Sequence, residues 1–448
     1  MEKKSKRRVV ILGAAGRDYH NFNVFFRDND AFEVVAFTQA PEQNLSEIEG
    51  EQLRTYPPSL AGKLYLNGIP TLYETDLEKI IRKHDIDVCV MAYSDGSYKS
   101  VGNLSARANA AGADFWLMGH KTTQVKSIKP LISVCAVRTG CGKSQVSRFI
   151  SDLLNKSGKR CVAVRHPMPY GDLAEQKVQR FATYDDLDKE KCTIEEMEEY
   201  EPYVERGMVI YAGVDYEAIL RAAEKESDVV LWDGGNNDMS FYKPDLLITV
   251  ADAHRPGHEF NYYPGEVNFR AADVVIISKI DSAKPEDVRA IEENARQANP
   301  RAKIIKAESR ITVKNGETLK GKRVIVVEDG PTLTHGGMSY GAGIVAAKRL
   351  GCKIVDARPY AVGSVKRAFE KYKQLDAVLP AMGYDAKQMK ELEQTIANAG
   401  KDVDAVIIGT PIDLGRHIKI AVPAHRVYYD YIDEGGALKN ILREKGFL

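Results

Sequence analysis

The stretch Leu131-Ile132-Ser133-Val134-Cys135-Ala136-Val137-Arg138-Thr139-Gly140-Cys141-Gly142-Lys143-Ser144 decides the central fold of this chain. Its first half is apolar and rich in β-branched residues, which predicts a buried strand. Its second half is a glycine-bearing loop that ends in Gly-Lys-Ser where a helical pattern begins. That order is typical of a phosphate-binding loop (P-loop), in which backbone N–H groups and the lysine hold phosphates while the Ser hydroxyl ligates Mg²⁺. One departure is Val137, which stands where the usual pattern has a glycine.

Two later strands end in residues that complete a nucleotide site. The apolar run Val229–Asp233 ends in an acid followed by two glycines, and such an Asp holds Mg²⁺ directly or through water. The run Val274–Ser278 leads into Lys279-Ile280-Asp281, the pattern with which many GTPases bind guanine, except that Ser278 replaces the commoner Asn. The pattern predicts a purine site and leaves ATP and GTP open.

The predicted nucleotide and metal ligands follow from these three segments. The nucleotide set is Arg138, Thr139, Gly140, Cys141, Gly142, Lys143, Ser144, Gln145, Lys279 and Asp281, and the Mg²⁺ ligands are Ser144 and Asp233.

Composition narrows the class of protein. The 448 residues carry 63 Lys and Arg against 63 Asp and Glu, so no basic excess favours nucleic-acid binding. The six cysteines show no C-x-x-C spacing, which argues against a zinc site or a disulfide framework. No apolar run approaches the ~18–20 residues that a membrane span needs. We therefore expect a cytoplasmic protein that contacts neither nucleic acid nor membrane.

Strands alternate with helical patterns in three regions, which predicts an α/β fold. Residues 1–127 are expected to form a Rossmann-like parallel sheet, 128–322 a P-loop NTPase core, and 323–448 a further α/β region. The third region is either a separate domain or an extension of the P-loop sheet. Residues 185–203 are very acidic with little apolar periodicity, and we interpret them as a surface excursion, such as a helical lid.

The first region opens on a strand followed by Gly13-Ala14-Ala15-Gly16. This turn lacks the G-x-G-x-x-G pattern, and no acidic residue ends the second strand, so NAD is disfavoured. A phosphate or carboxylate is the expected ligand of this turn. The candidate substrate-binding residues here are Gly13, Gly16, Arg17, His20 and Asn23.

Three further loops follow predicted strands and carry polar groups. Residues 165–172 and 252–258 combine Arg and His with Gly and Pro, which favours a second anionic ligand beside the nucleotide. Residues 328–343 contain five glycines among acidic and hydroxyl side chains, which is typical of backbone that approaches a ligand. The candidates in this last loop are Glu328, Asp329, Thr334 and His335.

Over nearly its whole length the chain resembles the cyclic 2,3-diphosphoglycerate synthetase family, whose relatives are often labelled predicted GTPases. The resemblance rests on long motifs that begin at Gly13, Val137, Arg165, Trp232, His254 and Glu328. It implies a ligase in which ATP and Mg²⁺ drive closure of 2,3-bisphosphoglycerate to its cyclic pyrophosphate, with ADP and phosphate released. Under this reaction Lys143 and Asp233 serve the triphosphate, and the acceptor is held by Arg165, His166, His254, Arg255 and His258.

A P-loop GTPase that acts on, or is regulated by, another small anion or a partner protein is the alternative. It would use the same nucleotide site. We also expect a homodimer, because many P-loop proteins of this kind pair their nucleotide faces.

Overall fold

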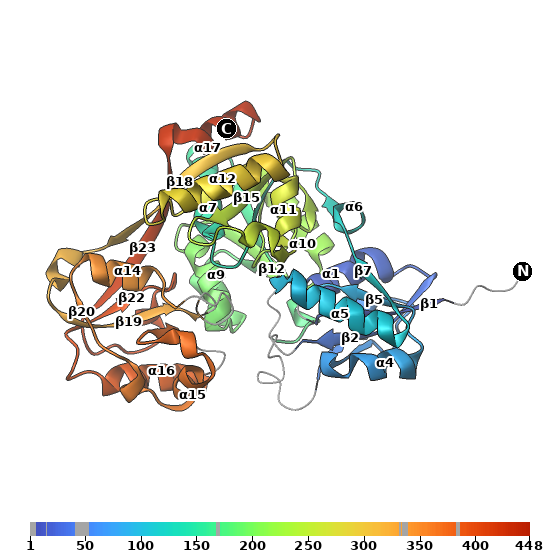
Figure 1. Ribbon diagram of the computed structural model, residues 1–448, viewed down its shortest axis with the longest axis horizontal. Coiled ribbons are helices and arrows are strands. Elements are labelled where there is room, and N and C mark those ends of the chain that lie inside the picture. Colours follow the sequence, from blue (N-terminus) through green and yellow to red (C-terminus); the bar gives the residue numbers. More distant parts are fainter. Residues whose placement is uncertain are drawn as a thin grey trace, which may run out of the picture.

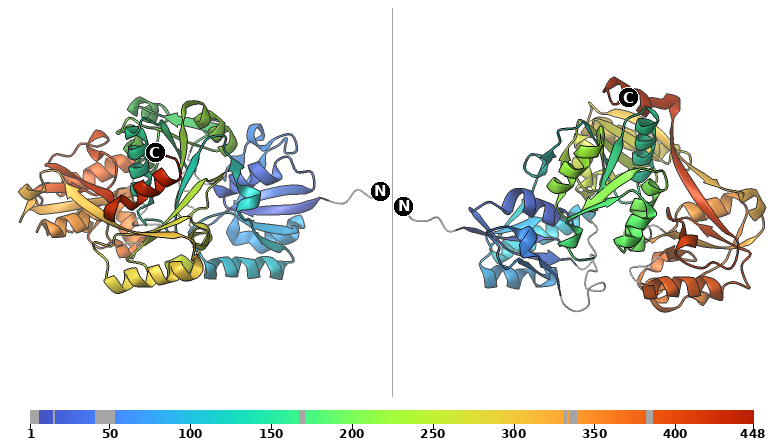
Figure 2. Two further views of the ribbon diagram at one scale, coloured as in Figure 1. Left: turned by 90° about the horizontal axis from the view of Figure 1, so that it is seen from above. Right: turned by 180° about the vertical axis from the view of Figure 1, so that it is seen from behind.

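The computed structural model describes residues 6–14, 16–40, 53–166, 171–330, 333, 339–381 and 386–448. Three units lie in a row, with the N-terminal unit at one end, the P-loop unit in the middle and the C-terminal unit at the other end (Figure 1). The view from above shows the same order (Figure 2). The expectation of an α/β fold built on parallel sheets is confirmed.

The N-terminal unit is a sheet covered on both faces. Its strands, in spatial order, are β3 (Thr55–Tyr56), β4 (Ile69–Tyr73), β2 (Phe32–Gln39), β1 (Arg7–Leu12), β5 (Val88–Met91) and β7 (Asp114–Leu117). All pairs are parallel except β3 with β4. The helices are α1 (Arg17–Asn21), α3 (Pro58–Ala61), α4 (Leu77–His84), α5 (Tyr98–Ala111) and α6 (His120–Thr123). Separate apolar clusters cover the two faces.

The P-loop unit is built on the central part of a second sheet. Its strands, in spatial order, are β11 (Val178–Phe181), β12 (Val209–Gly213), β10 (Cys161–Arg165), β13 (Val229–Asp233), β9 (Leu131–Ala136), β15 (Leu246–Asp252), β17 (Val274–Ser278) and β18 (Lys303–Val313). The central strands are buried on both faces and parallel, as their unbroken apolar runs predict. The helices are α7 (Lys143–Lys156), α8 (Tyr184–Lys189), α9 (Ile194–Val204), α10 (Tyr216–Glu226), α11 (Gly265–Ala271) and α12 (Pro285–Ala298).

A two-stranded ribbon carries this sheet into the C-terminal unit. The first part of β18 pairs with β17, and its second part pairs antiparallel with β23 (Ala424–Asp433). Beyond β23 follow β22 (Ala405–Ile408), β19 (Arg323–Asp329), β20 (Lys353–Ile354) and β21 (Leu379–Ala381), with helices α14 (Ala342–Arg349), α15 (Gly363–Lys371) and α16 (Ala386–Asn398). Within the described residues, the sheet is therefore continuous from the P-loop to β20.

The last helix returns to the middle unit. Helix α17 (Ala437–Glu444) places Leu438, Ile441 and Leu442 in the core around β9 and α7. Residues 437–448 thus pack on the P-loop core, although they follow the C-terminal unit in sequence.

The acidic segment 185–203 is helical, but its interpretation as a surface excursion is wrong for the second of its two helices, which is buried. It forms α8 and α9, each opened by a capping box, at Thr183 and Thr193. In α9, Ile194, Met197 and Tyr200 are buried against apolar residues of both the P-loop and C-terminal units. The many Glu residues of this segment make its apolar spacing hard to recognise in the sequence. Helix α9 packs between the P-loop and C-terminal units.

Short strand pairs attach the N-terminal unit to the P-loop unit. Strand β6 (Gly96–Ser97) pairs with β16 (Tyr262–Tyr263), and β8 (Val125–Lys126) pairs with β14 (Tyr242–Lys243). Among the described residues, no helix is long and apolar enough to cross a membrane.

Candidate active site

The P-loop has the predicted strand–loop–helix form. Strand β9 is buried throughout, and α7 begins at Lys143. Gly140 and Gly142 adopt φ values of +79° and +94°, which side chains other than glycine rarely accept. At Val137 the loop still follows the strand, because its N–H donates to the carbonyl of Val250. Val137, which replaces the usual glycine, thus comes directly after β9 and remains hydrogen-bonded to β15.

Three side chains hold the loop from outside by binding its carbonyl groups. Nη2 of Arg255 donates to the carbonyl of Thr139 at 2.8 Å, and Nζ of Lys279 donates to that of Gly140 at 2.7 Å. The hydroxyl of Ser278 donates to the carbonyl of Cys141 at 2.6 Å. With its carbonyls turned outward, the loop is organised to present N–H groups to phosphate oxygens.

Asp252 orients two of these cations. Its Oδ2 lies 2.7 Å from Nζ of Lys279 and 3.1 Å from Nη2 of Arg255. Burial opposes the ionised carboxylate, but Lys279 and Arg255 outweigh it and hold the pKa of Asp252 at about 2. The predicted acceptor ligand Arg255 is thus a residue that shapes the P-loop.

Asp233 binds Lys143 and two further side chains. Its carboxylate accepts hydrogen bonds from Lys143 at 2.8 Å, Ser147 at 2.7 Å and Tyr203 at 2.8 Å. Burial disfavours the charge, yet Lys143 and Arg165 keep the pKa of Asp233 below its ordinary value. For Lys143, burial followed by the charge of Arg165 lowers the pKa.

The residues present fit a magnesium ion carried by a nucleotide. The Ser144 side chain lines the cavity beside Lys143, and Asp233 supplies a carboxylate behind it. Among the described residues, no three His, Cys, Asp or Glu gather as metal ligands. Mg²⁺ commonly takes one or two protein oxygens and completes its shell with phosphate and water.

Arg165 and His166 lie at the end of β10. Arg165 donates to the carbonyls of Asp233 and Gly234 at 3.0 and 3.1 Å, and its Nη2 lies 2.5 Å from Oε1 of Glu199. His166 packs against Gly235, where a Cβ atom would lie 2.0 Å from the imidazole ring. Burial, then Arg165 and Lys143, push the pKa of His166 well below its ordinary value, so this imidazole is neutral.

The two histidines in the loop after β15 make different contacts. His254 lines the cavity, with Nε2 hydrogen-bonded to the Ser282 hydroxyl at 2.9 Å. His258 instead contacts Arg138, 3.2 Å from its Nδ1, and burial lowers its pKa to about 4. Arg138 is also bound to Asp95 of the N-terminal unit at 2.6 Å. This contact ties the P-loop to the first unit.

The N-terminal candidates lie in a seam between units and do not line the cavity as far as the structure describes it. Arg17 forms a buried ion pair with Asp238. The His20 ring stacks on the Phe241 ring with centroids 4.0 Å apart. Oδ1 of Asn23 accepts a hydrogen bond from the Tyr56 hydroxyl at 2.8 Å. Gly13 and Gly16 flank the turn, where Gly16 donates its N–H to Asp18. In this arrangement Arg17 and His20 hold units together.

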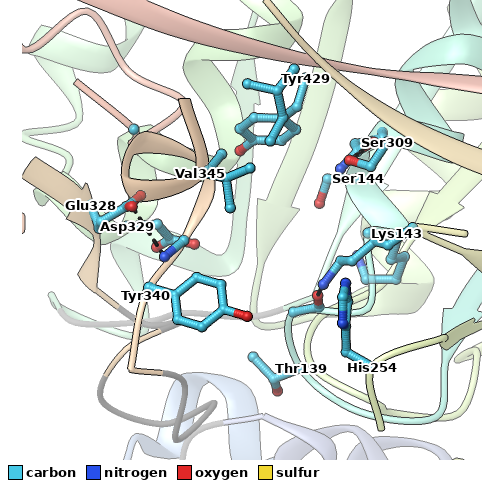
Figure 3. Close-up of a pocket in the computed structure, with 18 of the residues that line it drawn as sticks. Thr139, Lys143, Ser144, His254, Ser309, Glu328, Asp329, Tyr340, Val345 and Tyr429 are labelled. Atoms are coloured by element: carbon cyan, nitrogen blue, oxygen red, sulfur yellow. Dashed lines mark hydrogen bonds between the residues drawn. The ribbon is translucent and has the colours of Figure 1, made fainter. Parts of the chain in front are cut away.

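A cavity of about 220 Å³ joins the P-loop to the C-terminal unit. Figure 3 shows Lys143 and Ser144 on one side, with Glu328, Asp329 and Tyr340 across from them. All predicted nucleotide ligands except the buried Cys141 line this cavity, namely Arg138, Thr139, Gly140, Gly142, Lys143, Ser144, Gln145, Lys279 and Asp281. The sequence candidates Glu328 and Asp329 also line this cavity, whereas Thr334 and His335 lie outside the described residues.

Sequence reasoning did not single out three further lining residues, Glu199, Tyr340 and Tyr429. Glu199 comes from α9, Tyr340 precedes α14 and Tyr429 lies in the middle of β23. The apolar spacing of α9 could have shown that this helix is buried, and thus that Glu199 lies inside the protein. Tyr429 had no local signal, since only the pairing of β18 with β23 brings it to the site.

No family model matches the chain. The arginine synthetase ArcE of Thermococcus kodakarensis is 61% identical over 446 residues, which span 99% of this chain and 98% of that protein. The chain belongs to the family of this arginine synthetase. The name of this relative does not support the resemblance to cyclic 2,3-diphosphoglycerate synthetases.

Two solved structures are distantly similar to this member of the arginine synthetase family. LpxK from Aquifex aeolicus, in complex with ATP, is 14% identical, with 72% of this chain and 90% of that chain covered and a TM-score of 0.41. The hydrogenase maturation factor HypB from Archaeoglobus fulgidus is 19% identical, with 40% and 81% covered and a TM-score of 0.26. Likenesses this distant do not bear on the function.

Proposed function

We propose that this chain is an ATP- and Mg²⁺-dependent synthetase whose product is arginine. The observation that carries the proposal is a cavity in which the P-loop residues Lys143 and Ser144 lie across from the carboxyl groups of Glu328 and Asp329 (Figure 3). One end suits a triphosphate and the other suits a cation such as a guanidinium group. The 61% sequence identity, over nearly the full length, with a protein named arginine synthetase supports the same product.

The P-loop half of the cavity holds the nucleotide in this proposal. Lys143 and the loop N–H groups bind the β- and γ-phosphates, and Ser144 and Asp233 hold Mg²⁺. Lys279, Asp281 and Ser309 lie where the purine would sit, and Asp281 accepts from the N–H of Ser309 at 2.9 Å. We take ATP as the nucleotide and include GTP in the test.

Forming arginine requires a nitrogen to replace an oxygen on the carbon that becomes the guanidinium centre. A ureido oxygen is a poor leaving group until it carries a phosphoryl group. Transfer of the γ-phosphoryl group to this oxygen releases ADP, and attack by ammonia then forms the C–N bond while the C–O bond breaks and phosphate leaves. The task of the protein is to position both substrates and to neutralise phosphate charge, which Lys143 and the loop are built to do.

Closure of 2,3-bisphosphoglycerate is the second candidate, favoured by the basic side chains that line the cavity. They are Arg138, Lys143, Arg165, His254 and Lys279. Four of them already pair with carboxylates, at Asp95, Asp233, Glu199 and Asp252. A substrate with two phosphates and a carboxylate needs more uncompensated positive charge than this, and arginine is therefore the preferred product.

The test is a turnover assay with purified protein, Mg²⁺, the ureido analogue of arginine (citrulline) and ammonium, with either ATP or GTP. Arginine is measured by amino-acid analysis and nucleoside diphosphate by chromatography. The proposal predicts equal amounts of arginine and ADP. A parallel reaction with 2,3-bisphosphoglycerate is followed by phosphorus NMR. A new pyrophosphate resonance there, without arginine in the first assay, would establish the second candidate. Release of nucleoside diphosphate without any acceptor would instead indicate a GTPase or ATPase.

A further inference from the structure

The N-terminal unit holds the side chain of Arg138, a residue of the P-loop. Nε of Arg138 donates to Oδ1 of Asp95 at 2.6 Å, and the two side chains have exposed fractions of only 10% and 12%. Nη1 of the same guanidinium lies 3.2 Å from Nδ1 of His258, and its central carbon lies 3.6 Å from the centre of the Tyr262 ring. Because the planar guanidinium is held at two edges and on one face, its orientation is fixed.

The backbone that carries Asp95 is itself bound to the P-loop unit. Asp95 directly precedes β6, which pairs antiparallel with β16, the strand that contains Tyr262. The N–H of Asp95 donates to Oδ1 of Asn237 at 2.7 Å. Its φ of +65° lies in the left-handed region, which is uncommon for residues other than glycine. Such backbone persists where surrounding contacts hold it, often at functional sites, and here it presents the carboxylate to Arg138.

One donor group of Arg138 is unused within the described part of the chain. Nε and Nη1 contact Asp95 and His258, whereas Nη2 donates to no described residue and is reachable from solvent. Arg138 lines the cavity together with the next two residues of the loop, Thr139 and Gly140. The ion pair with Asp95 therefore leaves a hydrogen-bond donor for a ligand in the cavity. Guanidinium N–H groups match phosphate oxygens in charge and geometry.

The contacts around Arg138 favour the γ-phosphate as the ligand of this donor. Nδ2 of Asn237 donates to the carbonyl of Val137, the residue before Arg138, at 3.1 Å. Asn237 belongs to the loop that follows β13 and its last residue, Asp233. In the sheet, β13 lies on one side of β9, while β15 and then β17, which leads to the predicted purine segment, lie on the other. Val137 and Asp95 are thus both bound from the side of Asp233, where Mg²⁺ and the γ-phosphate are expected.

We propose that Nη2 of Arg138 binds the γ-phosphoryl group of ATP and that Asp95 is the positioning residue that holds Arg138 for this contact. This inference rests on the proposed function and gives the N-terminal unit a part in the active site. A donor that is fixed before the nucleotide arrives stabilises the charge of the transferred group without having to reorganise during the reaction. The short pair of β6 with β16 then serves to bring Asp95 to the P-loop.

The experiment compares wild-type protein with Arg138→Ala, Asp95→Asn and the control Arg27→Gln. The control removes another ion pair between the same two units, since Nη1 of Arg27 lies 3.7 Å from Oδ2 of Asp215, and neither residue is among the described lining residues. Calorimetry with Mg²⁺ measures the dissociation constants of ADP and of AMP-PNP, a non-hydrolysable ATP analogue that carries a γ-phosphate.

The two nucleotides should respond differently. Loss of one charged hydrogen bond predicts AMP-PNP binding weakened ~10-fold in Arg138→Ala, with ADP binding within about 2-fold of wild type. Asp95→Asn should show the same selective loss at ~3-fold, because a neutral amide holds the guanidinium less firmly. The control should match wild type. Equal weakening of both nucleotides, or none, in folded Arg138→Ala would overturn the contact with the γ-phosphate, and wild-type affinities in Asp95→Asn would overturn the positioning role.

This comparison needs no product, so it separates the inference from the proposed function. Selective loss of AMP-PNP binding in both variants supports the γ-phosphate contact even if no arginine is formed in turnover. Arginine formation at the wild-type rate by both variants would overturn the inference and leave the proposed function standing. Wild-type protein that binds neither nucleotide would overturn both. Circular dichroism establishes which variants are folded, and Arg138→Lys and Asp95→Ser replace a variant that does not fold.

Discussion

Nζ of Lys143 donates to Oδ1 of Asp233 over 2.8 Å, so the P-loop lysine is paired with the acid that ends β13. Both side chains are buried. Ser147 and Tyr203 bind the same carboxylate, which keeps Asp233 fixed when Lys143 turns to a phosphate oxygen. This pair links nucleotide binding to β13, α7 and α9 at one point.

Replacing Lys143 with Ala should abolish nucleotide turnover. The lysine supplies the mobile positive charge for the β- and γ-phosphates, and loss of one such electrostatic group lowers rates by ~100–1,000-fold. Steady-state release of nucleoside diphosphate measures the effect. Turnover at the wild-type rate would show that the nucleotide site lies elsewhere.

Arg255→Ala should weaken ATP binding more than it slows the chemical step. The side chain binds the carbonyl of Thr139 and does not line the cavity in the described part of the chain. Loss of one charge-assisted hydrogen bond predicts an ATP dissociation constant raised ~10-fold. Arg289→Ala, at an exposed position of α12, is the matched control. A large fall in kcat with unchanged ATP affinity would instead restore Arg255 as an acceptor ligand.

Truncation of Tyr200 should destabilise the whole protein, because α9 is part of the core. Tyr200 is 1% exposed and stacks on Phe181 with ring centroids 4.6 Å apart. Removal of a buried aromatic side chain costs about 3–5 kcal/mol in the free energy of unfolding. Urea denaturation of Tyr200→Ala beside the exposed-site control Lys189→Ala measures this. A change below about 1 kcal/mol would show that α9 is a loosely attached lid.

The pH dependence of stability should carry a contribution from Glu328. Burial raises the pKa of this carboxyl to about 7, even though three backbone N–H groups bind it. A carboxyl whose folded pKa exceeds its unfolded value favours the folded state at low pH. Its contribution is lost as pH rises from about 4.5 towards 7. Denaturation at pH 5 and pH 8 should therefore show a smaller difference for Glu328→Gln than for wild type. An equal difference in both proteins would exclude Glu328 as a source of the slope.

Local sequence patterns located the residues of the proposed nucleotide half of the site. The run 131–144, the strand that ends at Asp233 and the segment 274–281 each contain strand, loop and ligand within a few neighbouring positions. Such patterns are visible because the backbone itself performs part of the binding. The predicted ends of β9, β13 and β17 lie within one residue of the observed ones.

The other half depends on contacts between distant parts of the chain. Glu199 and Asp329 meet only because the β18–β23 ribbon places the C-terminal unit beside α9. Arg17 and His20 show the opposite case, since a glycine turn suggested ligand donors while Asp238 and Phe241 draw both side chains into a seam. Residue type and spacing do not report which partner a side chain finds across 200 residues.

The most direct test of the central claim follows the oxygen that nitrogen replaces. Citrulline labelled with ¹⁸O at the ureido oxygen is incubated with the protein, Mg²⁺-ATP and ammonium, and the released phosphate is analysed by mass spectrometry. Phosphoryl activation of that oxygen predicts one ¹⁸O in phosphate for each arginine formed. Unlabelled phosphate, or ADP release without arginine, would contradict the account.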